Sequence, residues 1–202
     1  MSLRKYTSWY TEILNRRPLR TKIITFGILA FAGDVTCQKL EQWTARSNSE
    51  KVKDYSFTRS LRLSSCYAFL CAPTVHFYYS LVIFRLWPKE TIPNVLKAVA
   101  FDNTIVSGQN LTLFLIYMNS TAGKTMEEIK QIFRENYFKT LLKYLYFWIP
   151  VGLVNFRYVP NHYRAIVVSV ASFIWTIVLS FIQSGIEKKN LQLKEQQGIK
   201  KL

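Results

Sequence analysis

The segment from Phe147 to Ser180 constrains the fold more than any other part of the chain. The run 165–182 begins inside this segment, ends two residues after it and contains no charged residue. At about 1.5 Å per residue, a helix over this run is just long enough to cross a bilayer core with help from its flanks. The preceding half is apolar, is interrupted by Pro150 and ends in the polar stretch NFRYVPNHYR. An uncharged crossing beside such a polar joint indicates an integral membrane protein rather than a soluble core.

The charge distribution favours lipid over nucleic acid as the partner. The 202 residues, half of them hydrophobic, suffice for one domain or one helical bundle, and they carry a net charge of +15. The basic residues lie at the edges of apolar runs, where Lys and Arg extend their charged ends to anionic headgroups. We therefore expect a phospholipid such as cardiolipin to bind at the first such cluster: Arg16, Arg17, Arg20 and Lys22.

Several classes of function find no support in the sequence. The three cysteines are odd in number and form no C-x-x-C pair, so neither a disulfide framework nor a zinc site is expected. There is no nucleophile–base spacing, phosphate-binding glycine loop or metal-ligand cluster. We expect a protein that is not an enzyme and that has no cofactor.

Hydropathy predicts an all-α, multi-pass transmembrane bundle over 19–185. Four crossings are expected, at 19–40, 63–84, 93–118 and 165–182, and a fifth follows if 144–156 spans the bilayer independently. Pro73 and Pro150 are expected to kink their helices because proline lacks a backbone donor. An even number of crossings would place both basic termini on one side.

Three further segments flank or interrupt this bundle. Residues 1–18 fit an amphipathic helix at the membrane interface, an uncleaved targeting element or a short solvent-capped helix. Residues 122–139 are charged and predict an interfacial helix. Residues 186–202 form a basic tail that is frayed or disordered when considered alone.

Short motifs, in order and at consistent spacing, resemble those of the Mpv-seventeen / peroxisomal-membrane-protein-twenty-two family of organelle membrane proteins. The last of them are W-x-P, N-F, V-P-x-H-Y-R and I-W-x-x-x-L-S, all between Trp148 and Ser180. Gly33, Asp34 and Gln38 match an earlier G-D-x-x-x-Q, and Pro73 and His76 match G-P-x-x-H-x-W-Y. The resemblance covers nearly the whole chain. It implies a small multi-pass protein of the inner mitochondrial or peroxisomal membrane.

The chain departs from the family pattern at polar positions. Asn103 replaces the glutamine of a D-Q pair that begins with Asp102, and Gly152 stands where many members carry glutamine. Ala72 and Tyr78 replace the usual glycine and tryptophan of the proline motif. These changes remove polar groups from the expected bundle interior and put in doubt a pore that depends on them.

Polar residues within apolar segments are the candidate interior or pore residues. Asp34 and Asp102 either line a hydrophilic path or have a structural role, in which each caps a kinked helix or pairs with an arginine. Arg157 and Arg164 are partners of the right type. The histidines fit fixed hydrogen-bond partners better than pH-sensitive gates. The complete set is Asp34, Gln38, His76, Asp102, Asn155, Arg157, His162 and Arg164.

Two functions remain open. The first is an accessory, structural subunit of a respiratory-chain or ATP synthase assembly in the mitochondrial inner membrane, whose termini contact other membrane subunits. The second is a small-solute channel, or a channel modulator, of the mitochondrial inner or peroxisomal membrane. Because pore-suited positions have changed at Asn103 and Gly152, the sequence favours the first. The chain ends in K-K-L and lacks the S-K-L address, which favours mitochondria.

Overall fold

A computed structural model describes residues 10, 12–14, 16–47, 52–87, 91–158 and 161–199, and every element within these residues is helical. Short π-helical segments, labelled η, interrupt two of the helical runs. The elements are α2 (Pro18–Ser47), α3 (Phe57–Cys66), η1 (Tyr67–Cys71), α4 (Ala72–Phe77), η2 (Tyr78–Ile83), α5 (Phe84–Leu86), α6 (Ile92–Phe101), η3 (Asp102–Val106), α7 (Ser107–Ser120), α8 (Met126–Tyr158) and α9 (Asn161–Ile199).

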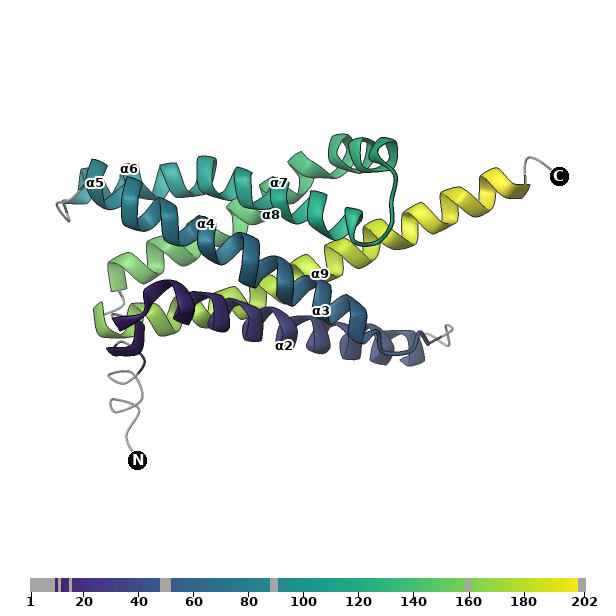
Figure 1. Cartoon of the computed structure of the whole chain (residues 1–202), viewed down its shortest axis with the longest axis horizontal. Coiled ribbons are helices and arrows are strands. Elements are labelled where there is room, and N and C mark those ends of the chain that lie inside the picture. The colour runs from purple at the N-terminus through teal and green to yellow at the C-terminus, as the bar shows by residue number, and fades with distance from the viewer. Residues whose placement is uncertain are drawn as a thin grey trace, which may run out of the picture.

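These elements form five consecutive helical runs that traverse the bundle in alternating directions: α2, α3 to α5, α6 to α7, α8 and α9 (Figure 1). The contacts confirm the directions. Gln38 near the end of α2 bonds Ser56 before α3, whereas Gly27 earlier in α2 accepts a bond from Ser64. The odd number of runs makes α2 and α9 parallel and places the two ends of the described chain at opposite ends of the bundle (Figure 1).

The turn between α7 and α8 has a clear local cause. Gly123 adopts a left-handed φ of 77°, which glycine tolerates because it has no Cβ. Thr125 and Glu128 then form a capping box, in which each side chain accepts a hydrogen bond from the other's backbone N–H, at 3.3 and 2.8 Å. The charged sequence of the first turns therefore begins a helix directly after the turn.

The predicted division of this region into an interfacial helix and a separate apolar segment is wrong. The helix α8 runs without interruption from Met126 to Tyr158 and includes Pro150 in its interior. The residues between the two predicted segments, from Thr140 to Lys143, contain no glycine or proline that would end a helix. The sequence changes from charged to apolar along α8, but the backbone stays α-helical throughout.

Pro73 lies where the helical hydrogen bonding changes. The π-helical segment η1 ends at Cys71, and the N–H of Ala72 still bonds the carbonyl of Tyr67, five residues earlier. Pro73 then falls in the first turn of α4, where its missing donor is least costly. The irregularity predicted at Pro73 thus takes the form of a π-to-α transition.

Among the described residues, two helices are long and apolar enough to cross a membrane: Pro18–Ser47 and Val170–Lys189. The four or five crossings expected from hydropathy are therefore not confirmed, and spanning by the other runs stays a prediction. Both qualifying helices carry exposed apolar side chains, such as Ile24, Ile28 and Val170, as a lipid-facing surface would. Ala30 of α2 and Trp175 and Leu179 of α9 face inward, into a core shared with Leu63 and Phe114.

The C-terminal segment is helical well beyond the predicted bundle. The helix α9 continues to Ile199, so most of the predicted frayed tail 186–202 is helical and extends beyond the bundle (Figure 1). A helix already held by its apolar half extends readily through a polar sequence that has no proline. The predicted amphipathic helix 1–18 lies mostly outside the described residues.

Candidate functional site: a buried ion-pair network between two cavities

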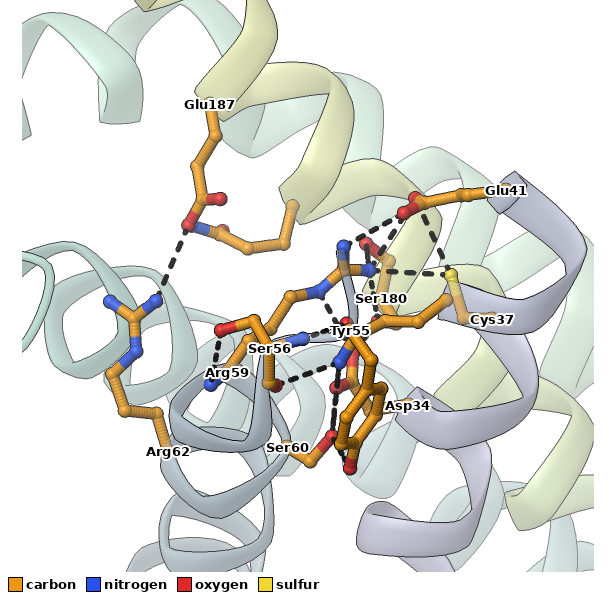
Figure 2. A network of polar contacts seen from close by, with 12 residues as sticks. Asp34, Cys37, Glu41, Tyr55, Ser56, Arg59, Ser60, Arg62, Ser180 and Glu187 are labelled. Atoms are coloured by element: carbon orange, nitrogen blue, oxygen red, sulfur yellow. Dashed lines mark hydrogen bonds and ion pairs between the residues drawn. The ribbon is translucent and has the colours of Figure 1, made fainter. Parts of the chain in front are cut away.

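Arg59 is placed in the bundle by the start of α3. Ser56 caps this helix, and its hydroxyl accepts a hydrogen bond of 3.3 Å from the backbone N–H of Arg59. From this first turn the guanidinium points towards Asp34 on α2 and Ser180 on α9 (Figure 2). Three helices therefore meet at one side chain.

The guanidinium of Arg59 makes charge-assisted bonds to all of these neighbours. Its Nε donates to Asp34 Oδ1 at 2.9 Å, and its Nη1 donates to Glu41 Oε2 at 2.8 Å. Its Nη2 donates to Ser180 Oγ at 2.8 Å, and Ser180 Oγ in turn donates to Asp34. The side chain of Asp34 is 1% exposed and that of Arg59 is 12% exposed, so both charges are removed from bulk solvent. Such charges are tolerated only when they are paired.

Polar residues around the pair satisfy the second oxygen of Asp34. Gln38 Nε2 and Ser60 Oγ donate to Asp34 Oδ2 at 2.7 and 2.6 Å. Gln38 also accepts the backbone N–H of Ser56 at 2.7 Å, which holds the loop before α3 against α2. Tyr55 adds a contact of 3.0 Å between its hydroxyl and that of Ser60 (Figure 2). We call Asp34, Gln38, Glu41, Arg59, Ser60 and Ser180 the ion-pair network.

The network balances the charge of Arg59. An arginine guanidinium is always charged in proteins, and here the carboxylates of Asp34 and Glu41 supply the compensating negative charge. Arg59 is therefore a permanent cation at this position.

A polar cavity of about 530 Å³ lies on the side of the network nearest the loop between α2 and α3. Its walls come from the second half of α2, the loop, the start of α3 and the later part of α9. The charged residues on these walls are Glu41, Lys53, Asp54, Arg59, Arg62, Glu187 and Lys188. We call this space the loop-side cavity.

A second cavity, of about 400 Å³, lies on the other side of the network. Its walls are mainly apolar and come from the first half of α2, from η1 and α4, and from α7, α8 and α9. Polar lining residues include Lys22, Asp102, Asn110, Ser172 and Thr176. We call this space the inner cavity.

The two cavities follow one another along the same pair of parallel helices. On α2, the inner cavity is lined by Lys22 to Leu29 and the loop-side cavity begins at Gln38. On α9, the inner cavity ends at Leu179 and the loop-side cavity begins at Ser184. Asp34 and Ser180 occupy the intervening turns. The ion-pair network therefore lies between the two spaces.

The structure brings some of the predicted site residues together and separates others. Asp34 and Gln38 belong to the network, whereas Asp102 lines the inner cavity. His76 lies on α4 and is partly buried. The side chains of Asn155, Arg157, His162 and Arg164 lie outside the described part of the structure.

The structure supplies a partner for Asp34 and a distinct environment for Lys22. Asp34 pairs with Arg59, because the N-terminus of α3 brings Arg59 next to α2. The side chains of Arg157 and Arg164, which the sequence suggested as partners, lie outside the described part of the structure. Arg16, Arg17 and Arg20 are exposed, whereas Lys22 is partly buried and lines the inner cavity. It follows Arg20 by two residues, which turns its side chain by about 200° around α2.

Arg59, Glu41 and Ser180 are members of the network that the sequence did not identify as candidate interior residues. In sequence, Arg59 precedes the apolar run 63–84 and resembles the other basic residues at the edges of such runs, but its environment is buried. Its one distinctive signal is the preceding Ser56, an N-cap that fixes where α3 begins. In the described part of the chain, no group of three or more His, Cys, Asp or Glu side chains is placed to hold a metal ion.

Two long apolar helices with exposed apolar side chains around a buried charge pair fit a helical integral membrane protein, and comparisons with known proteins support this class. Peroxisomal membrane protein PMP22 of Arabidopsis thaliana is 31% identical over 174 residues, which cover 85% of this chain and 86% of the relative. Mitochondrial inner membrane protein Mpv17 of Danio rerio is 28% identical over 85% of this chain and 93% of its own length. The chain belongs to the Mpv17 / PMP22 family, whose model matches residues 119–180.

The family match includes the segment from Phe147 to Ser180 that most constrained the fold, and it confirms the resemblance of the sequence motifs. Peroxisomal membrane protein 2 of Bos taurus is a third relative, 26% identical over 88% of this chain and 89% of its own length. The names of these relatives cover both the predicted mitochondrial inner membrane and the peroxisomal alternative. No solved structure matches the chain significantly.

Proposed function

We propose that this protein is a non-enzymatic membrane protein that provides a closed path for small solutes across the mitochondrial inner membrane or the peroxisomal membrane. The observation that carries the proposal is the alignment of two cavities along α2 and α9, with the ion-pair network between them. Polar groups inside a membrane bundle are costly, and they commonly mark a solute or ion pathway.

In this proposal the ion-pair network closes the path between the loop-side cavity and the inner cavity. Arg59 links α2, α3 and α9, and it fills the space between the cavities together with Asp34 and Ser180. Just beside it the helices touch, because a Cβ on Gly33 would lie 2.7 Å from Thr176 Cγ2. Opening would require Arg59 to leave Asp34 or α9 to move away from α2.

The altered polar positions that favoured an accessory subunit carry no weight against this path. Neither Gly152 nor Asn103 is among the residues that line the two cavities. A Cβ at Gly152 would meet no atom within 4 Å, so this position is not packed against another helix. Both departures from the family pattern therefore lie outside the set of residues that line the proposed path.

The proposal is tested with purified protein in planar bilayers and in liposomes loaded with small polar solutes. We expect rare openings from the unmodified protein and more frequent openings from Ser180→Gly, which removes one bond of Arg59 without leaving an unpaired charge. Thr176→Ser, on the adjacent turn of α9, tests whether looser helix contact has the same effect.

Arg46→Gln is the matched control, because this exposed residue at the end of α2 lines neither cavity. Its openings should equal those of the unmodified protein. Absence of conductance and solute leak above protein-free membranes, for the unmodified protein and for both α9 variants, would contradict the proposal.

An accessory subunit of a larger membrane assembly is the second candidate, and the extension of α9 favours it. This helix continues to Ile199 beyond the other helices (Figure 1), and it exposes Lys188, Lys189, Gln192 and Gln196. A surface of this kind suits contact with another subunit. Blue-native electrophoresis of mild detergent extracts tests the idea, and migration solely as a monomer or small homo-oligomer would exclude it.

We also propose that Arg16, Arg17 and Arg20 contact anionic lipid such as cardiolipin. All three are exposed at the start of α2, where headgroup phosphates would be within reach. Native mass spectrometry of the variant with all three changed to glutamine should show less bound cardiolipin. Retention of cardiolipin at the unmodified level would refute this role.

A further inference from the structure

Lys22 places an ammonium group at one end of an apolar cavity, with no counter-ion among the described residues. It lies in the second turn of α2, is partly buried and lines the inner cavity. Within the described part of the chain, it has no ion-pair or hydrogen-bond partner. A cation removed in part from water is costly unless an anion or polar group accompanies it.

Two residues that line the same cavity carry a polar atom without a partner among the described residues. Trp148 Nε1 is a buried donor and Asn110 Oδ1 is a buried acceptor, and the described part of the chain supplies a hydrogen bond to neither. Buried polar atoms are nearly always satisfied, by protein, water or a ligand. The residues around the inner cavity therefore include one charge and two hydrogen-bonding atoms that the described part of the chain leaves unpaired.

The remainder of the inner cavity suits an aliphatic chain. Phe26, Leu29, Val75, Phe114 and Leu179 are among its apolar lining residues, and Trp175 adds an aromatic face. Its volume of about 400 Å³ falls within the range of about 300–1,000 Å³ that is usual for small-molecule sites. An apolar wall with a few polar groups is the usual character of such sites.

We propose that the inner cavity binds an acyl chain whose anionic head group, a carboxylate or a phosphate, pairs with Lys22. The chain lies between α2, α7 and α9, and the head group lies at the end of the cavity nearest the start of α2. Asp102 also lines this cavity, but it already has an interaction within the protein. Lys22 is thus the lining charge that remains available for a ligand.

This site is distinct from the exposed arginines that precede it. Arg16, Arg17 and Arg20 can attract any anionic headgroup at the surface, whereas Lys22 is reached only by a ligand that also fills the cavity. The proposal does not depend on conduction. Binding can be present in a protein that carries no current, and the assay for binding uses no ion gradient.

Tryptophan quenching by brominated lipids tests the proposal in nanodiscs of neutral phospholipid. Trp148 and Trp175 line the cavity, so 9,10-dibromostearate should quench their emission saturably. Lys22→Gln should weaken this binding about tenfold, the usual effect of losing one charged hydrogen bond. Lys22→Arg should restore it, and the double variant Trp148→Phe/Trp175→Phe should lose the saturable component.

Arg46→Gln is the matched control, because it removes the same charge from an exposed position on the same helix, outside the cavity and away from the arginines proposed to contact lipid. Its affinity should remain that of the unmodified protein. The methyl ester of dibromostearate, tested on the unmodified protein, should bind about tenfold more weakly than the acid. This comparison needs no variant and therefore does not depend on how Lys22→Gln folds.

Brominated lysophosphatidate distinguishes the two sources of the anion. Tighter binding of the phosphate lipid would assign the site to a membrane lipid, and tighter binding of the carboxylate would assign it to a free fatty acid. Either result, with loss in Lys22→Gln, supports the proposal. Equal quenching by acid and ester, or an equal loss of affinity in Arg46→Gln and Lys22→Gln, would overturn it.

Discussion

Arg59 is the residue on which the polar interior of the bundle depends. It satisfies the buried carboxylate of Asp34 and also bonds Glu41 and Ser180. We expect Arg59→Met to lower the free energy of unfolding by about 3–5 kcal/mol, because it leaves Asp34 buried without its counter-ion. Denaturant unfolding in a mild detergent, followed by circular dichroism, measures the change.

Asp34→Asn in the Arg59→Met background separates the lost charge from the lost packing. Removing the unpaired carboxylate should recover part of the stability, since the remaining amide can still bond Gln38 and Ser60. Arg46→Met serves as the control for loss of an exposed arginine, with an expected change below about 0.5 kcal/mol. Equal effects of Arg59→Met and Arg46→Met would show that the network contributes little to stability.

At the scale of single residues, the carboxylate of the network, Asp34, could be predicted from the sequence, but its partner Arg59 could not. A carboxylate within an apolar run must be paired or exposed to water, so Asp34 could be singled out from hydropathy alone. Arg59 could not be recognised as its partner, because it lies 25 residues away and contacts Asp34 only through the packing of α3 on α2. The position of Lys22 in a cavity could not be predicted for the same reason: sequence gives the position along a helix more readily than the direction of a side chain.

At the scale of helices, α2 and α9 approach closely because Gly33 has no side chain. A Cβ added at Gly33 would lie 2.7 Å from Thr176 Cγ2 and 2.9 Å from Thr176 Cβ. We expect Gly33→Ala to destabilise the protein by about 1–3 kcal/mol, because one of the helices would have to shift. Thermal unfolding in detergent micelles measures the effect.

Two substitutions make this measurement specific to the helix contact. Gly185→Ala, on α9, places a Cβ where no atom lies within 4 Å, and it should be neutral or stabilising by up to about 1 kcal/mol. Thr176→Ser removes the closest methyl group and should partly rescue Gly33→Ala. Destabilisation of Gly185→Ala to the same extent would mean that the loss in Gly33→Ala does not come from the close approach to Thr176.

The helices themselves were largely predictable, and their joins were not. Apolar runs located α2 and the last crossing, because hydropathy and periodicity depend on local sequence. The change from charged to apolar sequence within α8 was mistaken for a boundary, although no glycine or proline lies near Thr140. The helical extension to Ile199 was missed for a related reason: a polar sequence does not reveal whether the preceding helix will continue through it.

At the scale of the whole molecule, the five helical runs give a different arrangement of the ends from the one that four crossings implied. Because α2 and α9 are parallel, the loop between α2 and α3 lies at the same end of the bundle as the later part of α9 (Figure 1). Lys53 and Gln192 line the same loop-side cavity, which supports this placement independently. The ends of α5 and α8 lie at the opposite end.

This arrangement predicts which positions share a side of the membrane. In proteoliposomes, an impermeant maleimide should label Lys53→Cys and Gln192→Cys from one side, and Leu86→Cys and Tyr158→Cys from the other. Unmodified protein supplies the background, because Cys37, Cys66 and Cys71 are buried. If α8 did not span, α9 would return to the side of Leu86, and Gln192→Cys would label with that residue. Labelling of Lys53→Cys and Gln192→Cys from opposite sides would therefore exclude five crossings. It would also contradict a path along parallel α2 and α9.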